Sequence, residues 1–391
     1  PEPDRSAPVR LWVDRAFSIR GAGTVVTGTL CGGRIRTGDE LELASTGELV
    51  RVRALQSLGE PVPYAEAVAR VAVNLRGVDR DRVRRGDALV TPGRFQRTDL
   101  ADIRLDSCPV DDLPRDLMLH IGSAAVAVQL RPLGRDTARL RLSRPLPLHI
   151  GDRALLRDPG RRHVVGGITV LDVAPPPLRG RGAAAARAAA LADASGKPDE
   201  QEQLRRLGLA RRRDLRRMGV SVASAPVVGD WVADPDHWAH LRRRLQEEVR
   251  RRARDNPLEM GVPVEVLRQA LDLPDRALVD ALVVPPLVSR AGRVIDEAAR
   301  LPDELTRAVE RLHADLAAHP FQAPSLGRLA ELGLGPREVR AAVRAGLLIH
   351  LADNLVLLPD VVEKAVQVLT ELPQPFTASQ ARVALDTNRR V

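Results

Sequence analysis

Three consecutive prolines, Pro175 to Pro177, divide this chain into two parts with different hydrophobic periodicities. Proline lacks a backbone N–H, so a run of three continues neither a central strand nor a helix interior. Short segments of alternating polarity, separated by glycine turns, come before the prolines. Helical patterns come after them. We therefore expect an all-β part and a helical part joined by a linker.

The all-β part predicts two small barrels. Its strands are short and its turn signals recur every 8 to 12 residues or so, which is typical of Greek-key barrels. The alternation is clearest from Arg139 to Leu142, where leucines fall on one face and arginines on the other. A turn at Thr91-Pro92-Gly93 sets the boundary, which gives barrels over residues 8–93 and 94–175.

The helical part contains an internal repeat of about 60 residues. Similar stretches align at 204–209 (LRRLGL), 267–273 (LRQALDL) and 326–334 (LGRLAELGL), and each precedes a second helical pattern and a short apolar hairpin. Helix, helix and hairpin is the order of a winged helix. The sequence thus predicts a multidomain protein in which tandem winged helices follow the barrels, with winged helices over residues 176–255, 256–300 and 301–371.

The two ends of the sequence suggest a fragment. The chain begins at Pro1 without an initiator methionine. A fourth helical unit begins within residues 372–391 and stops before its second helix. We expect a truncated fourth winged helix, although whether such a truncation is natural is not written in the sequence.

Composition indicates a soluble protein that meets polyanions. The net charge is +9 and only two of the 60 basic residues are lysines, Lys197 and Lys364. This excess of arginine favours RNA or DNA as a partner, although a solvated arginine-rich surface is the simpler alternative. With two distant cysteines, no export signal and no apolar run of membrane length, we expect a cytoplasmic monomer with no membrane partner. Cys31 and Cys108 are interpreted as small core residues.

The most informative string runs from Asp14 to Leu30 (DRAFSIRGAGTVVTGTL), followed by GRIRTGDEL from Gly33 to Leu41. This string resembles the second domain of translational GTPases. In that family the glycines mark tight turns and close strand approaches, as their freedom at positive φ allows. The resemblance implies a translation-factor β-barrel over residues 8–93.

The version that begins Asp-Arg-x-Phe is similar to the selenocysteine-specific elongation factors. The second predicted barrel supports this choice with LHIGS from Leu119, GDR from Gly151 and RDPGRR from Arg157. A tail of repeated winged helices is also an architecture of that family. The resemblance implies three partners: selenocysteyl-tRNA, an mRNA selenocysteine-insertion hairpin and the ribosome, with delivery at recoded UGA codons.

One part of that family is missing from the sequence. No GxxxxGK[ST] phosphate-binding loop occurs in the chain, and its only Gly-Lys pair, Gly196-Lys197, is followed by proline. We therefore expect a chain without the N-terminal GTPase domain, with no catalytic residues, no cofactor and no metal. GTP and Mg would belong to the full-length protein.

The resemblance assigns an aminoacyl pocket to Asp14, Arg15 and Arg70. Selenocysteine carries a selenol that is largely ionised at neutral pH, whereas serine carries a neutral hydroxyl. A guanidinium stays charged at physiological pH and donates hydrogen bonds to an anion, and a carboxylate orients it. The alternative is a surface ion pair at a strand end.

Two further groups of basic residues are candidate RNA contacts. The resemblance of the second barrel implies tRNA contacts at Arg157, Arg161, Arg162 and His163. The first helical repeat concentrates seven arginines that are candidate phosphate contacts or, alternatively, a solvated basic face: Arg205, Arg206, Arg211, Arg212, Arg213, Arg216 and Arg217. His237 and His240 lie three apart without a third ligand nearby, so we expect no metal there.

Two other functions stay open at this stage. One is a generic translational GTPase fragment that binds an ordinary aminoacyl-tRNA, from which Asp14 and Arg15 would distinguish this chain. The other is a winged-helix DNA-binding regulator, against which the two barrels argue.

Overall fold

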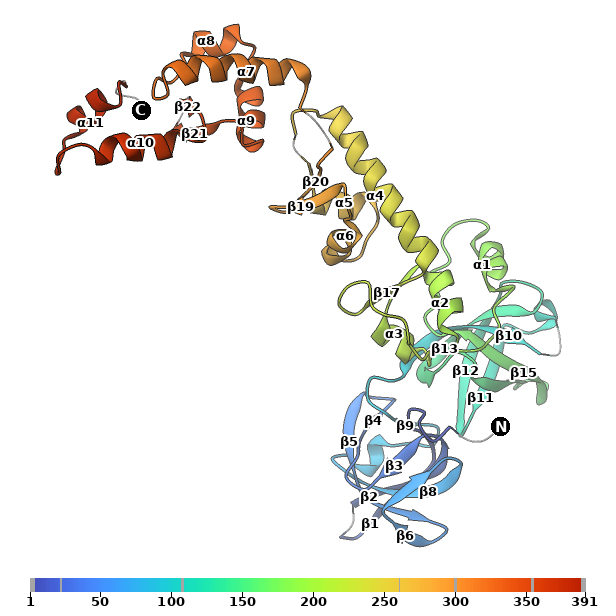
Figure 1. Cartoon of the computed structure of the whole chain (residues 1–391). Helices are drawn as coiled ribbons and strands as arrows, with labels where there is room; N and C mark the ends of the chain where they lie inside the picture. The colour runs from blue at the N-terminus through green and yellow to red at the C-terminus, as the bar shows by residue number, and fades with distance from the viewer. Residues whose placement is uncertain are drawn as a thin grey trace. The chain divides into compact units, whose positions relative to one another are not determined.

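The computed structural model describes residues 4–21, 23–106, 109–259, 261–298, 301–352 and 355–387. The chain divides into two compact units, Pro1–His237 and Trp238–Val391 (Figure 1). The first unit contains two six-stranded antiparallel β-barrels and a mixed helical segment. The second contains helices and small sheets, so the predicted fold class is confirmed. No helix in the described ranges is long and apolar enough to cross a membrane.

The first barrel closes through the order β4-β9-β1-β2-β8-β5, with β5 pairing back to β4. Its strands alternate in burial; in β8, Val71, Val73 and Leu75 face the core. A short strand extends the sheet beside β5, and a separate two-stranded ribbon joins β3 to β7. The bounds are β1 (Arg10–Ile19), β2 (Gly23–Gly32), β3 (Arg34–Arg36), β4 (Glu40–Leu43), β5 (Glu48–Ser57), β6 (Glu60–Val62), β7 (Tyr64–Glu66), β8 (Ala69–Arg76) and β9 (Ala88–Val90).

The second barrel closes through the order β10-β13-β12-β11-β14-β15. Strand β14 returns beside β11, which is the Greek-key arrangement that the sequence predicts. Leu140 and Leu142 face the core as expected, and Arg141 is exposed, but Arg139 on the outer face is covered by other residues. The bounds are β10 (Gln96–Leu105), β11 (Asp116–Ile121), β12 (Ala124–Pro132), β13 (Thr137–Leu148), β14 (Arg153–Asp158) and β15 (His163–Asp172).

The two barrels share a buried junction. Arg10 of the first barrel makes a two-bond ion pair with Asp152 of the second, with both N–O distances at 2.6 Å. Trp12 lies within the apolar core of the second barrel, and the Ser123 hydroxyl donates to the Val13 carbonyl. A buried two-bond pair with an aromatic anchor holds both partners in one geometry. The strand that carries the candidate pocket is therefore fixed at its base.

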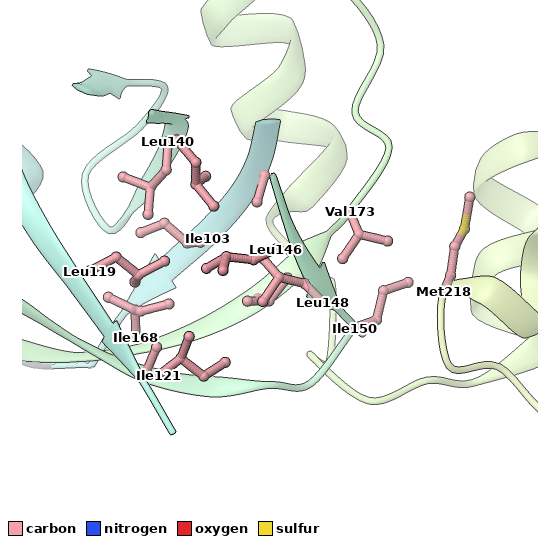
Figure 2. Packing of buried hydrophobic residues seen from close by; sticks show 14 of the residues in the cluster. Ile103, Leu119, Ile121, Leu140, Leu146, Leu148, Ile150, Ile168, Val173 and Met218 are labelled. Atoms are coloured by element: carbon pink, nitrogen blue, oxygen red, sulfur yellow. The ribbon is translucent and has the colours of Figure 1, made fainter. Parts of the chain in front are cut away.

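The segment after the prolines packs onto the second barrel. It consists of α1 (Ala183–Leu191), α2 (Glu200–Leu207), β16 (Leu209–Arg211), α3 (Arg212–Arg217) and β17 (Trp231–Ala233). Leu204, Leu215 and Met218 join the apolar core of that barrel. Figure 2 shows this shared core, in which Met218 lies beyond Ile150. The Met218 carbonyl also accepts from the Ile150 N–H at 2.9 Å, so this segment is an integral part of the first unit.

A buried ion cluster covers the outer face of the second barrel at Arg139. Asp102 accepts from Arg139 and from Arg187, both at 2.7 Å. Asp172 accepts from Arg187 at 2.5 Å and also from Arg206. Every side chain of the cluster is at most 13% exposed. The cluster joins α1 and α2 to the barrel wall by charge, where the cluster in Figure 2 joins them by packing.

The second unit follows the order of winged helices. Its first module has a three-stranded sheet, β18-β20-β19, beside helices α5 and α6, and its second has a β21–β22 hairpin beside α8 and α9. Two further helices follow. The bounds are α4 (Pro235–Asp255), which starts just before the division, β18 (Val262–Pro263), α5 (Val264–Ala270), α6 (Arg276–Leu282), β19 (Leu287–Arg290), β20 (Arg293–Asp296), α7 (Asp303–Ala318), α8 (Leu326–Glu331), α9 (Pro336–Arg344), β21 (Ile349–Ala352), β22 (Leu355–Leu357), α10 (Val361–Thr370) and α11 (Ala378–Ala384).

The repeat is real, but its first copy is aligned wrongly by sequence. Helices α3, α5, α8 and α11 each end on a residue with positive φ, and the next residue donates its N–H back to the carbonyl five positions earlier. This helix-end motif needs glycine or a tolerant residue. The positive-φ residues are Gly219, Asp272, Gly333 and Asp386. The stretch at 204–209 ends at Gly208, which imitates the motif, so α3 rather than α2 is the true counterpart.

This alignment changes the first winged helix. In the second unit, a recognition helix (α6 or α9) starts within three residues of the motif. All residues from 218 to 231 are described, and none is helical. Instead the Glu200 carboxylate accepts the N–H groups of Ala223 and Ser224, and Pro226 disfavours a helix. The predicted helix-turn-helix of the first repeat is therefore wrong, because its second helix is absent.

Candidate functional site

A β-bulge in the first barrel presents Asp14 and Arg15. In the β1–β2 ladder Val13 pairs with Gly28 and Arg15 pairs with Thr27, so Asp14 is an extra residue on β1. Bulges bend a strand and redirect its side chains. Gly28 makes this one possible, since a Cβ there would lie 2.2 Å from the Trp12 carbonyl oxygen. The Thr-Gly of the GTVVTG string is thus the local cause of the site.

The structure brings Asp14 and Arg70 together. The register of β2 with β8 places Arg70 opposite Thr29, two residues from Thr27. Arg70 donates to the two carboxylate oxygens of Asp14 at 2.5 and 3.2 Å. The Thr27 hydroxyl donates to Asp14 Oδ1 at 2.6 Å. Thr27 was not identified from the sequence, although its place in the strand opposite Arg15 was a usable signal.

The charges around Asp14 leave one cation unpaired. Burial disfavours ionisation of Asp14, but hydrogen bonds from Thr27 and Arg70 outweigh it and hold the pKa of this carboxyl below its ordinary value. Arg15 is exposed, and within the described ranges its guanidinium makes no hydrogen bond or ion pair. The site therefore has two guanidinium groups and one carboxylate, and it carries a net positive charge that suits an anion.

The candidate tRNA contacts lie on one hairpin of the second barrel. Arg157 is on β14, and Arg161, Arg162 and His163 follow in the turn to β15; all four are exposed. Asp158 shapes this turn by accepting the N–H groups of Gly160 and Arg161. The sequence grouped these residues correctly in space, and their contact with tRNA stays a prediction.

The seven arginines of the first repeat do not form one surface. Arg205, Arg213 and Arg217 are exposed. Arg206 is in the buried ion cluster with Asp172, and Arg211 lies over the Trp231 ring at 4.6 Å. The two others, Arg212 and Arg216, are half-buried. Only part of the predicted group is free to meet phosphate.

A basic helix face that the sequence reading missed lies in the second unit. Arg337, Arg340 and Arg344 on α9 are exposed and fall at helical spacing on one face. The equivalent helix α6 has a single arginine, Arg276, beside the acidic Asp280. Because α9 is the recognition helix of its module, its charge matters for nucleic acid.

No metal site emerges from the residues that the structure describes, because no group of three or more His, Cys, Asp or Glu side chains comes together there. His237 packs against Gly208. Cys31 is exposed on β2, so the expectation that it is a core residue is wrong; it lies on the outer face of the strand. Cys108 lies outside the described residues.

Two family descriptions match the chain. "Elongation factor Tu domain 2" matches residues 23–90. "Selenocysteine-specific elongation factor, beta-barrel domain" matches residues 114–177. Both are barrel domains, and they fall on the first and second barrels. The first match contains Thr27, Gly28 and Arg70.

Individual proteins agree with these matches. The selenocysteine-specific elongation factor of Escherichia coli (strain K12) is 30% identical over 301 residues, covering 70% of this chain and 47% of that protein. That of Desulfomicrobium baculatum is 33% identical over 183 residues, covering 44% and 29%. The chain thus spans about half the length or less of these relatives.

A solved structure extends the likeness to the fold of the whole chain. The crystal structure of a bacterial selenocysteine-specific elongation factor, EF-Sec, superimposes with a TM-score of 0.67 at 20% identity, covering 99% of this chain and 66% of that one. At this identity the likeness concerns the fold. Taken with the family and sequence matches, it identifies the chain as SelB-like, a relative of the selenocysteine-specific elongation factors.

Proposed function

We propose that this chain is the RNA-binding part of a selenocysteine-specific elongation factor. Its first barrel binds the aminoacyl end of selenocysteyl-tRNA, and its second unit contacts the mRNA hairpin that marks a recoded UGA codon on the ribosome. The observation that carries the proposal is the unpaired Arg15 beside the Asp14–Arg70 pair, on a barrel that matches a translation-factor domain.

The chemistry of the pocket supports selenocysteine over serine. Arg70 is committed to Asp14 by two hydrogen bonds, so Arg15 is the guanidinium that meets the selenolate. A seryl hydroxyl would leave this cation without its anion. Sites that leave a polar group unpaired reject the wrong substrate by as much as about 10⁴-fold, whereas a hydrophobic slot reaches about 10²-fold.

The RNA half of the proposal rests on α9. Its three exposed arginines fit phosphate groups, and a winged helix presents its recognition helix to nucleic acid. Module α5–α6 has little such charge. We therefore assign the hairpin contact of the described modules to α9, with the exposed hairpin at Arg161 and Arg162 left to the tRNA.

We propose further that this chain does not itself hydrolyse GTP. It contains no phosphate-binding loop, and GTP with Mg would be held by a separate domain of the complete factor. A titration with labelled GTP at physiological salt is expected to show no saturable binding. Micromolar binding would contradict this part of the proposal.

The test of the proposal is a comparison of two aminoacyl forms of one tRNA. Binding of selenocysteyl-tRNA and seryl-tRNA to the chain is measured by fluorescence anisotropy for the wild type, Arg15→Ala and Arg70→Ala. Arg51→Ala is the matched control, because Arg51 is exposed on β5 of the same barrel. We expect Arg15→Ala to abolish the preference and Arg51→Ala to keep it. A generic aminoacyl-tRNA binder would show no preference in the wild type.

A further inference from the structure

A second basic site lies on the first barrel, away from Asp14 and Arg70. It is an open hollow of about 500 Å³ between the N-terminal segment, strand β3 and the linker that leaves β9. Its charged lining consists of four arginines and one aspartate, namely Arg5, Arg34, Arg36, Arg94 and Asp39. The hollow belongs neither to the aminoacyl pocket nor to the tRNA hairpin of the second barrel.

The backbone around this hollow is held in place. The Val9 N–H donates to Thr91 Oγ1 at 2.8 Å, and the Gly33 N–H donates to the Asp4 carbonyl at 3.1 Å. Gly33 adopts a φ of +77°, and a Cβ there would lie 2.4 Å from the Ala7 carbonyl oxygen. The walls of the hollow therefore approach each other closely, which favours a preformed site.

The charges of the hollow do not balance. Arg5 and Arg34 share one carboxylate, Glu66. Asp39 accepts from the backbone N–H of Arg36 rather than from its guanidinium. Within the described part of the chain, the guanidinium groups of Arg36 and Arg94 have no hydrogen-bond or ion-pair partner. Four guanidinium groups thus face two carboxylates, and two of them are free to bind an anion.

An exposed aromatic ring stands beside these cations. Tyr64 is the only tyrosine of the chain and is 51% exposed. It pairs across the β3–β7 ribbon with Arg36, and Arg34 lies over its ring at 5.2 Å. Cross-strand partners project from the same face of a ribbon. Two arginines and an aromatic ring therefore share one face at the edge of the hollow.

We propose that this hollow and the face of Tyr64 bind the phosphodiester backbone of a structured RNA. Guanidinium forks match phosphate oxygens in pairs, and an adjacent ring stacks on a base or ribose. This combination favours RNA over an acidic protein, which would use the charges but not the ring. The inference rests on the proposed function, and two sources, the tRNA body and ribosomal RNA, share the chemistry.

The test uses the full chain and an unacylated tRNA for selenocysteine, so it does not depend on the aminoacyl pocket. Affinity is measured between low and physiological salt for Arg36→Gln/Arg94→Gln and for Tyr64→Ala. The control is Arg51→Gln/Arg131→Gln, which removes two exposed charges elsewhere on the barrels. Isolated small ribosomal subunits form a second arm, and inorganic phosphate and polyglutamate serve as competitors.

We expect the Arg36/Arg94 variant to lose about two units of the log–log salt slope, because each lost phosphate contact removes about 0.7–0.9. Its affinity should fall tenfold or more in the arm that supplies the RNA. Tyr64→Ala should weaken binding without changing the slope. Equal losses in the control variant, or polyglutamate competing as well as RNA, would overturn the proposal. Loss of aminoacyl preference in Arg15→Ala is scored separately, so either proposal can fail alone.

Discussion

The buried ion cluster predicts that removing a carboxylate and removing an arginine have very different costs. The cluster holds three guanidinium groups against two carboxylates. Asp172→Asn leaves Arg187 and Arg206 facing each other with one acid fewer. Arg187→Met instead leaves Asp102 with Arg139 and Asp172 with Arg206. The second variant balances the cluster, while the first increases its excess charge.

The magnitudes follow from this difference. Leaving buried charge uncompensated costs about 3–5 kcal/mol, whereas replacing a charge so that the remaining groups pair is close to neutral. Asp172 is 1% exposed and Arg187 is 7% exposed, so solvent offers little relief. We therefore expect Asp172→Asn to weaken the attachment of α1 and α2 to the second barrel by about 3–5 kcal/mol, and Arg187→Met to weaken it by less than about 1.5 kcal/mol.

Hydrogen exchange is the suitable assay, because a chain of several domains need not unfold in one step. Amides of α1 and α2 should exchange about two to three orders of magnitude faster in Asp172→Asn, at about 1.4 kcal/mol per tenfold. Amides of β12 serve as the internal control. Equal acceleration in Arg187→Met and Asp172→Asn would refute the charge-balance reasoning.

Three further predictions concern the first barrel and its junction. Gly28→Ala places a Cβ against the Trp12 carbonyl and should lower stability by about 3 kcal/mol, seen as a lower thermal midpoint; an unchanged midpoint would mean that the bulge tolerates a side chain. Thr27→Val removes a hydrogen bond to Asp14, so the pKa of Asp14 should rise toward its ordinary value in carboxyl NMR titrations, and a constant pKa would count against the geometry. Burial lowers the pKa of His149 from 6.5 to about 4. The unfolded chain therefore binds this proton first, and stability should fall as the pH drops from 6.5 toward 4. His149→Phe keeps a ring to stack on Phe95 and should flatten that part of the urea midpoint profile; an identical profile would contradict the role of His149.

The barrels were predictable because their information is local. Alternating residues and positive-φ glycines specify strands and turns, and the string around Gly28 contains the bulge that presents Asp14 and Arg15. The pairing of Asp14 with Arg70 came from the resemblance and not from spacing, since 56 residues separate them. Thr27 and the free cations Arg36 and Arg94 depend on register and on which carboxylates are already occupied, and periodicity does not report either.

The helical part was harder for a physical reason. Leu-Gly-Leu at 207–209 and Met-Gly-Val at 218–220 satisfy the same requirement for a positive-φ residue after a helix. Sequence alone cannot rank them. Likewise Arg206 reads as a surface charge until its carboxylate partner, Asp172, is brought beside it by the fold. Exposure is a tertiary property, so a run of arginines does not establish a nucleic-acid surface.

The central claim, that Arg15 reads a negative charge on the aminoacyl group, is tested most directly with cysteinyl-tRNA. A cysteine thiol has an ordinary pKa of about 8.5, so the same side chain is neutral at pH 7 and anionic at higher pH. Amide-linked analogues of cysteinyl- and seryl-tRNA avoid hydrolysis during the titration. We predict that affinity for the cysteinyl form rises about tenfold or more between about pH 7 and 9.5, while affinity for the seryl form stays constant and Arg15→Ala removes the rise. A cysteinyl affinity that does not change with pH, or one that rises equally in Arg15→Ala, would contradict the account.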